Sequence, residues 1–217
     1  MTETALFARM ERELYSAVLS DALDQVGVRN HTANPRIRPL KSGMVAAGRA
    51  ATILCATVHE VPEKPYEMII GALDKLKPNE VAFLAAEDVS AAIWGELLST
   101  ASRARGARGA VIDGVTRDVK QIVKMNYPVF STGITPTDSS GRADVVETGT
   151  TVKSGDAEIR PGDIVFADID GVVVVPRGVE KDVLKLSFDK VRKENVVRSE
   201  LIKGRLLRQV WEKHGVL

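Results

Sequence analysis

The most restrictive feature of this sequence is a regular alternation of helical and extended patterns between residues 65 and 131. A helix is predicted after Pro65, where apolar residues recur at spacings of three and four, and Pro78 ends it. Further helices are predicted at 95–105 and 119–125, between short apolar strands at 81–86, 110–113 and 128–131. Strands and helices that alternate in this way form βαβ units, so we predict an α/β fold with a largely parallel sheet.

The segments that flank this alternation are predicted to add a helix and two extended runs. Residues 6–23 show helical spacing of apolar side chains, and we expect one helix that ends near Gly27. A polar loop follows over 29–43, and the runs 44–47 and 50–58 are predicted to be extended.

The C-terminal third is predicted to begin with antiparallel strands and to end in a helix. Residues 152–159 contain a turn signal, and Asp170-Gly171 predicts a tight hairpin between 164–169 and 172–175. The strand 172–175 is apolar at every position, so both of its faces should be covered. A long charged helix from about 178 to 213, broken near Gly204, completes what we predict to be one domain over 1–217.

Composition excludes few classes of function. The 30 basic and 29 acidic side chains give a net charge of +1, which offers no electrostatic argument for a nucleic-acid partner. No stretch approaches the ~20 apolar residues of a membrane span, and the N-terminus lacks the pattern of a signal peptide. The default expectation is therefore a cytoplasmic protein with no membrane partner. The single cysteine, Cys55, is expected to be a small buried side chain and not a nucleophile.

Several common chemistries lack their sequence signatures. His31, His59 and His214 have no paired spacing of the kind that zinc ligands show. Neither a nucleophile elbow, nor a phosphate-binding glycine loop, nor a dinucleotide fingerprint is present, and the last absence also argues against a methyltransferase. Lys120 and Lys124 are predicted to lie on a partly exposed helix, which does not favour a Schiff-base mechanism.

The residues that could carry chemistry lie between Trp94 and Asp118. Gly95 stands where a helix is predicted to begin, so a ligand can approach the free N–H groups of residues 96–98, which favour an anion such as a carboxylate. Arg117 and Asp118 follow a predicted strand, and ligands bind at the carboxyl ends of strands in α/β sheets. Asp118 could hold a hard divalent cation while Arg117 faces an anionic substrate oxygen. The alternative is that Asp118 is a helix N-cap and Arg117 a surface charge.

This stretch resembles the RraA-like proteins, which include the 4-hydroxy-4-methyl-2-oxoglutarate/4-carboxy-4-hydroxy-2-oxoadipate aldolases. The family pattern is an acidic residue, twenty intervening positions and then Arg-Asp, and Glu96 with Arg117-Asp118 matches it. The similarity extends through residues 135–142, 161–163 and 170–171. It implies a three-layer α/β/β fold like the swivelling phosphohistidine domain, assembled as a homotrimer or homohexamer.

The resemblance also implies a site and a reaction. Asp118 would bind Mg2+ or Mn2+, Glu96 would hold a metal-bound water, and Glu194 of a neighbouring subunit would add an acid. The backbone of Gly95, Glu96, Leu97 and Leu98 would receive the substrate carboxylate, and Arg117 would contact the keto oxygen. The implied activity is a metal-dependent lyase that releases pyruvate from a small 2-oxo acid, by aldol cleavage or by decarboxylation of oxaloacetate.

One departure and one alternative accompany this resemblance. Many of the aldolases have another acid three positions after the aspartate, where this sequence has Gln121, so aldol cleavage is expected to suffer more than decarboxylation. The alternative function is that of the name-giving members, which are non-catalytic regulators that bind a ribonuclease and share the Arg-Asp motif.

Overall fold

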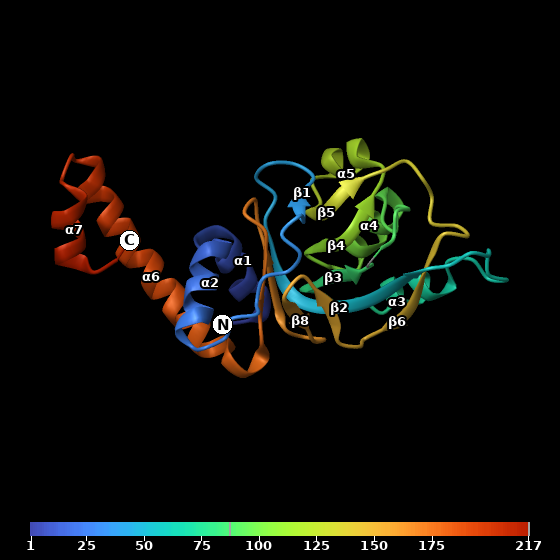
Figure 1. Cartoon of the computed structure of the whole chain (residues 1–217), viewed down its shortest axis with the longest axis horizontal. Helices are drawn as coiled ribbons and strands as arrows, with labels where there is room; N and C mark the ends of the chain where they lie inside the picture. The colour runs from blue at the N-terminus through green and yellow to red at the C-terminus, as the bar shows by residue number, and fades with distance from the viewer. Residues whose placement is uncertain (87, 217) are drawn as a thin grey trace.

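A mixed sheet of eight strands forms the centre of the computed structural model, which describes residues 1–86 and 88–216 (Figure 1). Its four middle elements run parallel: β2 (Ala46–Thr57), β3 (Glu80–Ala85), β4 (Gly109–Thr116) and β5 (Val129–Ile134). The three connections between them are helical: α3 (Glu67–Asp74), α4 (Glu96–Ala104) and α5 (Val119–Met125). The predicted alternation and the parallel sheet are confirmed.

Antiparallel strands complete the sheet on both sides. The predicted hairpin is present as β9 (Ile164–Ala167) and β10 (Val172–Val175), and β9 also pairs with the first part of β2. The remaining strands are β1 (Arg38–Pro39), which pairs with β5, and β6 (Ala143–Thr148), which pairs with the second part of β2. All four valines of β10 are buried, as predicted, because alternate side chains enter two different apolar clusters.

The two faces of the parallel strands are covered by different layers. Leu84 and Ile112 point toward the helices α3, α4 and α5, whereas Phe83 and Val111 point to the opposite face. A separate hairpin of β7 (Val152–Ser154) and β8 (Ala157–Ile159) packs on that opposite face. The layers are therefore helix, sheet and sheet, as the predicted α/β/β class requires.

The prediction of one helix over 6–23 was wrong. The chain forms α1 (Glu3–Glu13) and α2 (Ser16–Gln25), separated by Leu14 and Tyr15 in extended conformations. The backbone N–H and the hydroxyl of Ser16 each donate to the Asp168 carboxylate at 2.8 Å, which fixes the start of α2. That acceptor is distant in sequence, and the break contains neither glycine nor proline, so no local signal marks it.

The two extended runs predicted at 44–47 and 50–58 belong to one continuous strand, β2. Gly48 lies in its interior, and a Cβ added there would be 2.5 Å from the carbonyl oxygen of Asn79. The glycine thus permits a close approach of two backbones and does not end the strand.

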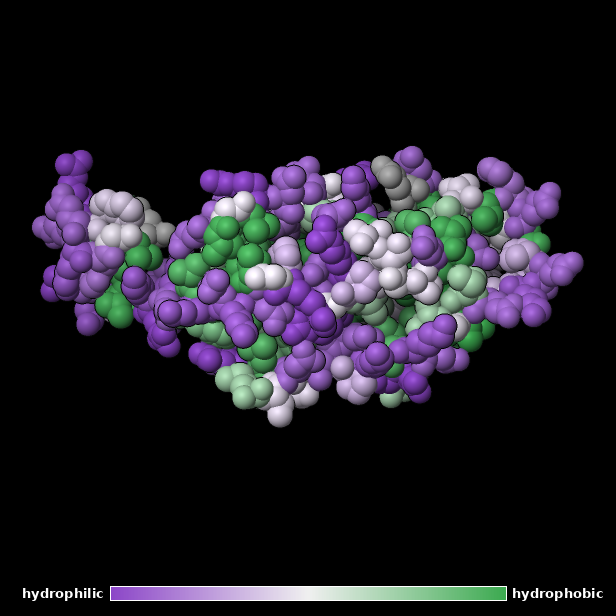
Figure 2. Space-filling model, turned by 90° about the horizontal axis from the view of Figure 1, so that it is seen from below, coloured by the Kyte–Doolittle hydropathy of each residue, from purple (hydrophilic) through white to green (hydrophobic). Residues whose placement is uncertain are grey.

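The C-terminal helices form an arm that extends away from the sheet (Figures 1 and 2). A 3-10 turn, Arg177–Val179, leads into α6 (Glu180–Ile202), and α7 (Leu207–His214) folds back on it. The predicted break near Gly204 is confirmed, and Gly204 has a φ of +82°. Ile202 and Leu206 are 80% and 66% exposed on this arm. Within residues 1–86 and 88–216, no helix is both long and apolar enough to cross a membrane.

Candidate active site

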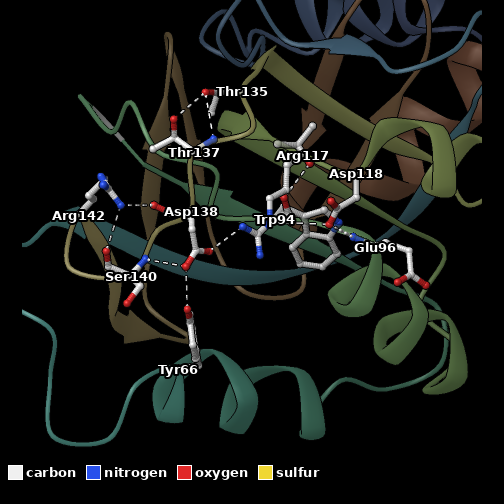
Figure 3. Close-up of polar contacts among 11 residues, drawn as sticks. Tyr66, Trp94, Glu96, Arg117, Asp118, Thr135, Thr137, Asp138, Ser140 and Arg142 are labelled. Atoms are coloured by element: carbon white, nitrogen blue, oxygen red, sulfur yellow. Dashed lines mark hydrogen bonds and ion pairs between the residues drawn. The ribbon is translucent and has the colours of Figure 1, made fainter.

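Asp118 lies in the turn between β4 and α5 and has an unusual backbone conformation. Its φ of +59° is left-handed, which aspartate tolerates better than most residues with a side chain. It occupies the N-cap position of α5, but its side chain makes no capping hydrogen bond. The carboxylate Oδ2 instead accepts a hydrogen bond from the backbone N–H of Glu96, at 3.2 Å (Figure 3). Asp118 is thus the N-cap residue of α5, as the alternative predicted, but its carboxylate does not cap that helix.

Gly95 allows the Asp118 carboxylate to approach the start of α4 closely. A Cβ at position 95 would lie 2.6 Å from Asp118 Oδ2 and 3.4 Å from Cγ of Arg117. The backbone of Gly95 is extended, with φ −160°, so the glycine serves close approach and not an unusual φ. A side chain at residue 95 would therefore displace the Asp118 carboxylate from its position beside the start of α4.

The backbone before α4 is fixed against the end of β4. The carbonyl of Trp94 accepts hydrogen bonds from the N–H of Arg117 and from the hydroxyl of Thr116, each at 3.0 Å. The buried indole N–H of Trp94 donates to Ser99 Oγ at 2.8 Å, which anchors the same residue to α4. These bonds hold the residues around Gly95 and Asp118 in one register.

Arg117 forms an ion pair that the sequence did not predict. Its Nη1 lies 2.9 Å from Asp138 Oδ1, and its Nε lies 3.7 Å from Asp118 Oδ2. Asp138 also accepts hydrogen bonds from Tyr66 Oη at 2.9 Å and from the N–H of Ser140 at 3.3 Å (Figure 3). Asp138 therefore holds the guanidinium from the side opposite to Asp118.

Electrostatics at Asp138 keep its carboxylate charged. Burial by itself would raise the pKa of Asp138, but the hydrogen bonds from Tyr66 and Ser140 and the charge of Arg117 lower it below its ordinary value. The same contact raises the pKa of the Tyr66 phenol, since the hydrogen bond to Asp138 favours the protonated hydroxyl. The Arg117–Asp138 pair is thus ionised at neutral pH.

These residues border a cavity of about 340 Å³. Arg117, Asp118 and Asp138 line it together with Gly95, Leu97 and Leu98 at the start of α4. The other walls come from β2, α3, the segment before α4, and β6, and include Cys55, Tyr66, Ile69, Ile70, Ala92, Ile93, Trp94, Ser139, Ala143, Asp144 and Val145. The structure therefore brings Arg117 and Asp118 to one cavity beside the N-terminus of a helix.

The other predicted site residues are placed differently. The N–H of Glu96 donates to Asp118, whereas the N–H groups of Leu97 and Leu98 lie in the first turn of α4, whose N-cap residue is Gly95 and has no side chain. The carboxylate of Glu96 points away from Asp118 (Figure 3), and it accepts a hydrogen bond from Thr100 Oγ1 at 2.7 Å. Glu194 lies on α6, away from α4 and α5 (Figure 1), and accepts a hydrogen bond from Tyr15. The roles predicted for Glu96 and Glu194 remain predictions.

The oxygen atoms at this site are chemically suited to a hard divalent cation. Asp118 Oδ2 has one N–H partner, and no hydrogen bond to its Oδ1 is found within the described residues. Across those same parts of the chain, no group of three or more His, Cys, Asp or Glu side chains could hold a metal ion. Because Mg2+ is commonly bound by one or two carboxylates and keeps several waters, a single aspartate fits this donor chemistry.

Sequence reasoning missed Asp138 and Tyr66. Asp138 lies in the segment 135–142 that carried the resemblance, but no role was predicted for it. Tyr66 precedes α3, about fifty positions before Arg117, and only the folded chain brings it near. The expectation that Cys55 is a buried side chain is confirmed, since it is 4% exposed, and burial is the main reason why its pKa is raised to about 12.

The fold and this arrangement define a small α/β/β protein with an arginine–aspartate cavity at the carboxyl end of a parallel strand. The chain belongs to the RraA-like family (Aldolase/RraA), whose model matches residues 16–174. It is 30% identical over 180 residues to a Halalkalibacterium halodurans protein named "Putative 4-hydroxy-4-methyl-2-oxoglutarate aldolase", covering 82% of this chain and 80% of that one.

Other relatives carry different names. Protein DlpA of Legionella pneumophila is 30% identical over 198 residues, which cover 91% of this chain but only 32% of DlpA, so this chain spans about a third of that protein's length. The structure of Streptomyces coelicolor RraAS2, titled an unusual member of the RNase ES inhibitor RraA protein family, has a TM-score of 0.78 and 25% identity. That match covers 89% of this chain and 96% of the other.

Proposed function

We propose that this chain is a divalent-metal-dependent lyase that cleaves a carbon–carbon bond of a small 2-oxo acid and releases pyruvate. The observation that carries the proposal is the convergence of Arg117 and Asp118 on one cavity, beside the first turn of α4, where the N–H of Glu96 donates to Asp118. The name of the Halalkalibacterium halodurans relative supports the class of reaction. Aldol cleavage of 4-hydroxy-4-methyl-2-oxoglutarate and decarboxylation of oxaloacetate are both included, because each leaves the enolate of pyruvate.

Different residues of the chain bind the substrate and stabilise the charge that develops on it. The N–H groups of Leu97 and Leu98 bind the substrate carboxylate at the positive end of α4. Arg117 faces the keto oxygen and stabilises the negative charge that develops there, a contribution of about 3 kcal/mol for a well-placed donor. Asp138 is a positioning residue, because its ion pair at 2.9 Å restricts the guanidinium to one orientation.

Asp118 is the residue that would hold Mg2+ or Mn2+, and the cation would withdraw electrons from the keto oxygen. Aldol cleavage also needs a base for the proton of the C4 hydroxyl, and we assign this step to a water held by Glu96. Decarboxylation needs no such base, so loss of Glu96 should lower the aldol reaction more. Gln121 is exposed on α5 and does not line the cavity, and it supplies no further acid.

The test is a panel of 2-oxo acids assayed for pyruvate release with and without Mg2+. Arg117→Ala and Asp118→Asn should each abolish turnover without changing the circular dichroism spectrum. Arg36→Ala serves as the matched control, since Arg36 is exposed and does not line the cavity. Equal activity in EDTA would rule out the metal, and full activity of either site variant would rule out the proposed roles.

We further propose that the chain assembles as a trimer or hexamer in which Glu194 of a neighbouring subunit completes the site. A mixing experiment tests this directly. Glu194→Gln and Asp118→Asn proteins, each inactive alone, should recover activity when they are unfolded together and refolded, because mixed interfaces contain one intact site. Recovery no greater than that of the separately refolded proteins would contradict a shared site.

A second candidate function is a regulator that binds a ribonuclease, which the similarity to RraAS2 favours. A pull-down with a ribonuclease E-type enzyme, together with an assay of its RNA cleavage, distinguishes the candidates. A regulator should inhibit cleavage equally well as the wild type and as Asp118→Asn, whereas a lyase should release pyruvate and leave RNA cleavage unchanged.

A further inference from the structure

The cavity is larger and less polar than the pyruvyl part of a substrate requires. Its volume of about 340 Å³ corresponds to about eleven molecules of liquid water. The groups proposed to bind the carboxylate and the keto oxygen lie at the α4 and β4 side. The remaining space lies against β2, α3 and β6, and it must accommodate whatever is attached to C4 of the substrate.

The walls of this remaining space are mainly hydrocarbon and sulfur. Cys55 on β2, Ile69 and Ile70 on α3, and Ala143 and Val145 on β6 line it. Figure 2 shows hydrophobic surface among hydrophilic side chains at the end of the molecule that carries α3 and β6. The Cys55 thiol stays protonated at neutral pH, because burial and the nearby Asp144 raise its pKa to about 12. Such walls stabilise an apolar substituent by removing it from water.

The charges around the cavity disfavour a second carboxylate. Among the described residues that line it, Arg117 is the only cation, and it already pairs with Asp138 at 2.9 Å. Asp144, on β6, also lines the cavity and adds a negative charge to that wall. Arg142 is nearby in the chain but donates to the carbonyl oxygens of Asp138 and Ser140 and is not part of the lining. A distal carboxylate would therefore receive no free cation from the described residues of this chain that line the cavity, and Asp144 would repel it.

We propose that the preferred substrate is a 4-hydroxy-2-oxo monocarboxylate whose C4 carries an uncharged, mainly apolar substituent. This inference rests on the proposed lyase function. The C4 hydroxyl proton passes to the base, the C3–C4 bond breaks, and its electron pair forms the enolate of pyruvate. C4 becomes the carbonyl of an apolar aldehyde, and the enolate then takes up a proton at C3, so no redox partner is needed.

The experiment compares 4-hydroxy-2-oxo acids that differ only in the C4 substituent, and it includes oxaloacetate as a separate test of the lyase function. Wild-type protein with Mg2+ is assayed for pyruvate release from 4-hydroxy-2-oxo acids that carry a phenyl, an isobutyl or a carboxymethyl group, and from oxaloacetate. We expect kcat/KM for the phenyl or isobutyl compound to exceed that for the carboxymethyl compound at least about tenfold. An equal or higher value for the carboxymethyl compound overturns this inference and leaves the proposed lyase function intact. Absence of pyruvate from every substrate overturns the lyase function and the inference together.

A pair of variants tests the cavity wall itself. Ile70→Arg adds a cation at an exposed position that lines the cavity, and should lower kcat/KM for the apolar substrates and raise it for the carboxymethyl compound, each about tenfold. Met68→Arg adds the same charge to the same helix at an exposed position outside the lining and should leave both values unchanged. Similar changes in the two variants would overturn the assignment of this wall to the C4 substituent.

Discussion

Replacing Gly95 by alanine tests the geometry of the site with a single methyl group. The new Cβ would lie 2.6 Å from Asp118 Oδ2, whereas ordinary contact begins at 3.4 Å. The carboxylate therefore has to retreat by about 0.8 Å, the difference between these distances. A misplacement of about 1 Å at a reacting centre costs about 100-fold in rate, so kcat/KM for pyruvate release should fall by about 100-fold, or ~2.7 kcal/mol.

The same substitution should have little effect on folding. Residue 95 has an extended backbone that alanine adopts without strain, and alanine restricts the unfolded chain more than glycine does. We expect a change in the unfolding free energy below about 1 kcal/mol, measured by urea denaturation. Gly178→Ala is the control, because a Cβ at residue 178 meets nothing within 4 Å. If Gly95→Ala kept more than a third of wild-type kcat/KM, close approach of Gly95 would not be what positions Asp118.

Three further predictions concern backbone conformation, burial and thiol chemistry. Asp118→Gly should lose turnover, as Asp118→Asn does. Its unfolding free energy in urea should stay within about 1 kcal/mol of the wild type, because relief of the left-handed conformation offsets the flexibility of glycine. A loss above about 3 kcal/mol would contradict this expectation. Burial raises the pKa of Glu194 from its ordinary 4.5, so its contribution to stability is present below that pH and is lost as the pH rises through the shifted pKa. Glu194→Gln should accordingly melt at a higher temperature than the wild type at pH 7, with the gap closing toward pH 4, and a constant gap would argue against burial as the cause. Because its pKa is raised to about 12, Cys55 should not react with iodoacetamide at pH 8 until the protein is unfolded in urea. Mass spectrometry measures the labelling, and rapid labelling of the folded protein would refute this expectation.

Sequence patterns predicted the elements whose signals are local. The helix 119–125 was predicted with the bounds that α5 has, because a strand, a turn and a short amphipathic helix follow each other there. The burial of both faces of β10 followed from four successive valines. The break between α1 and α2 was not predictable, since it depends on the carboxylate of Asp168 from the far end of the chain.

The candidate site shows the same difference between residues with local sequence signals and residues that only distant contacts bring together. Arg117 and Asp118 were identified because they adjoin a strand end and match a family motif, and the cavity contains both. Asp138 and Tyr66 were missed because only the pairing of β4 with β5 and the packing of α3 against β6 and α4 bring three distant segments around one guanidinium. The direction of the Glu96 carboxylate was also beyond sequence reasoning, because it depends on the rotamer that Thr100 stabilises.

The pairing of β2 bears on how the whole chain opens to solvent. This strand is hydrogen-bonded to β3 along one edge and to β9 and β6 in succession along the other, so it joins the end with the N-terminal helices to the end with the cavity. Neither end can detach without breaking part of that ladder. Backbone amides of β2 should therefore exchange with deuterium only through cooperative, global opening, whereas amides of the α6–α7 arm should exchange through local fraying.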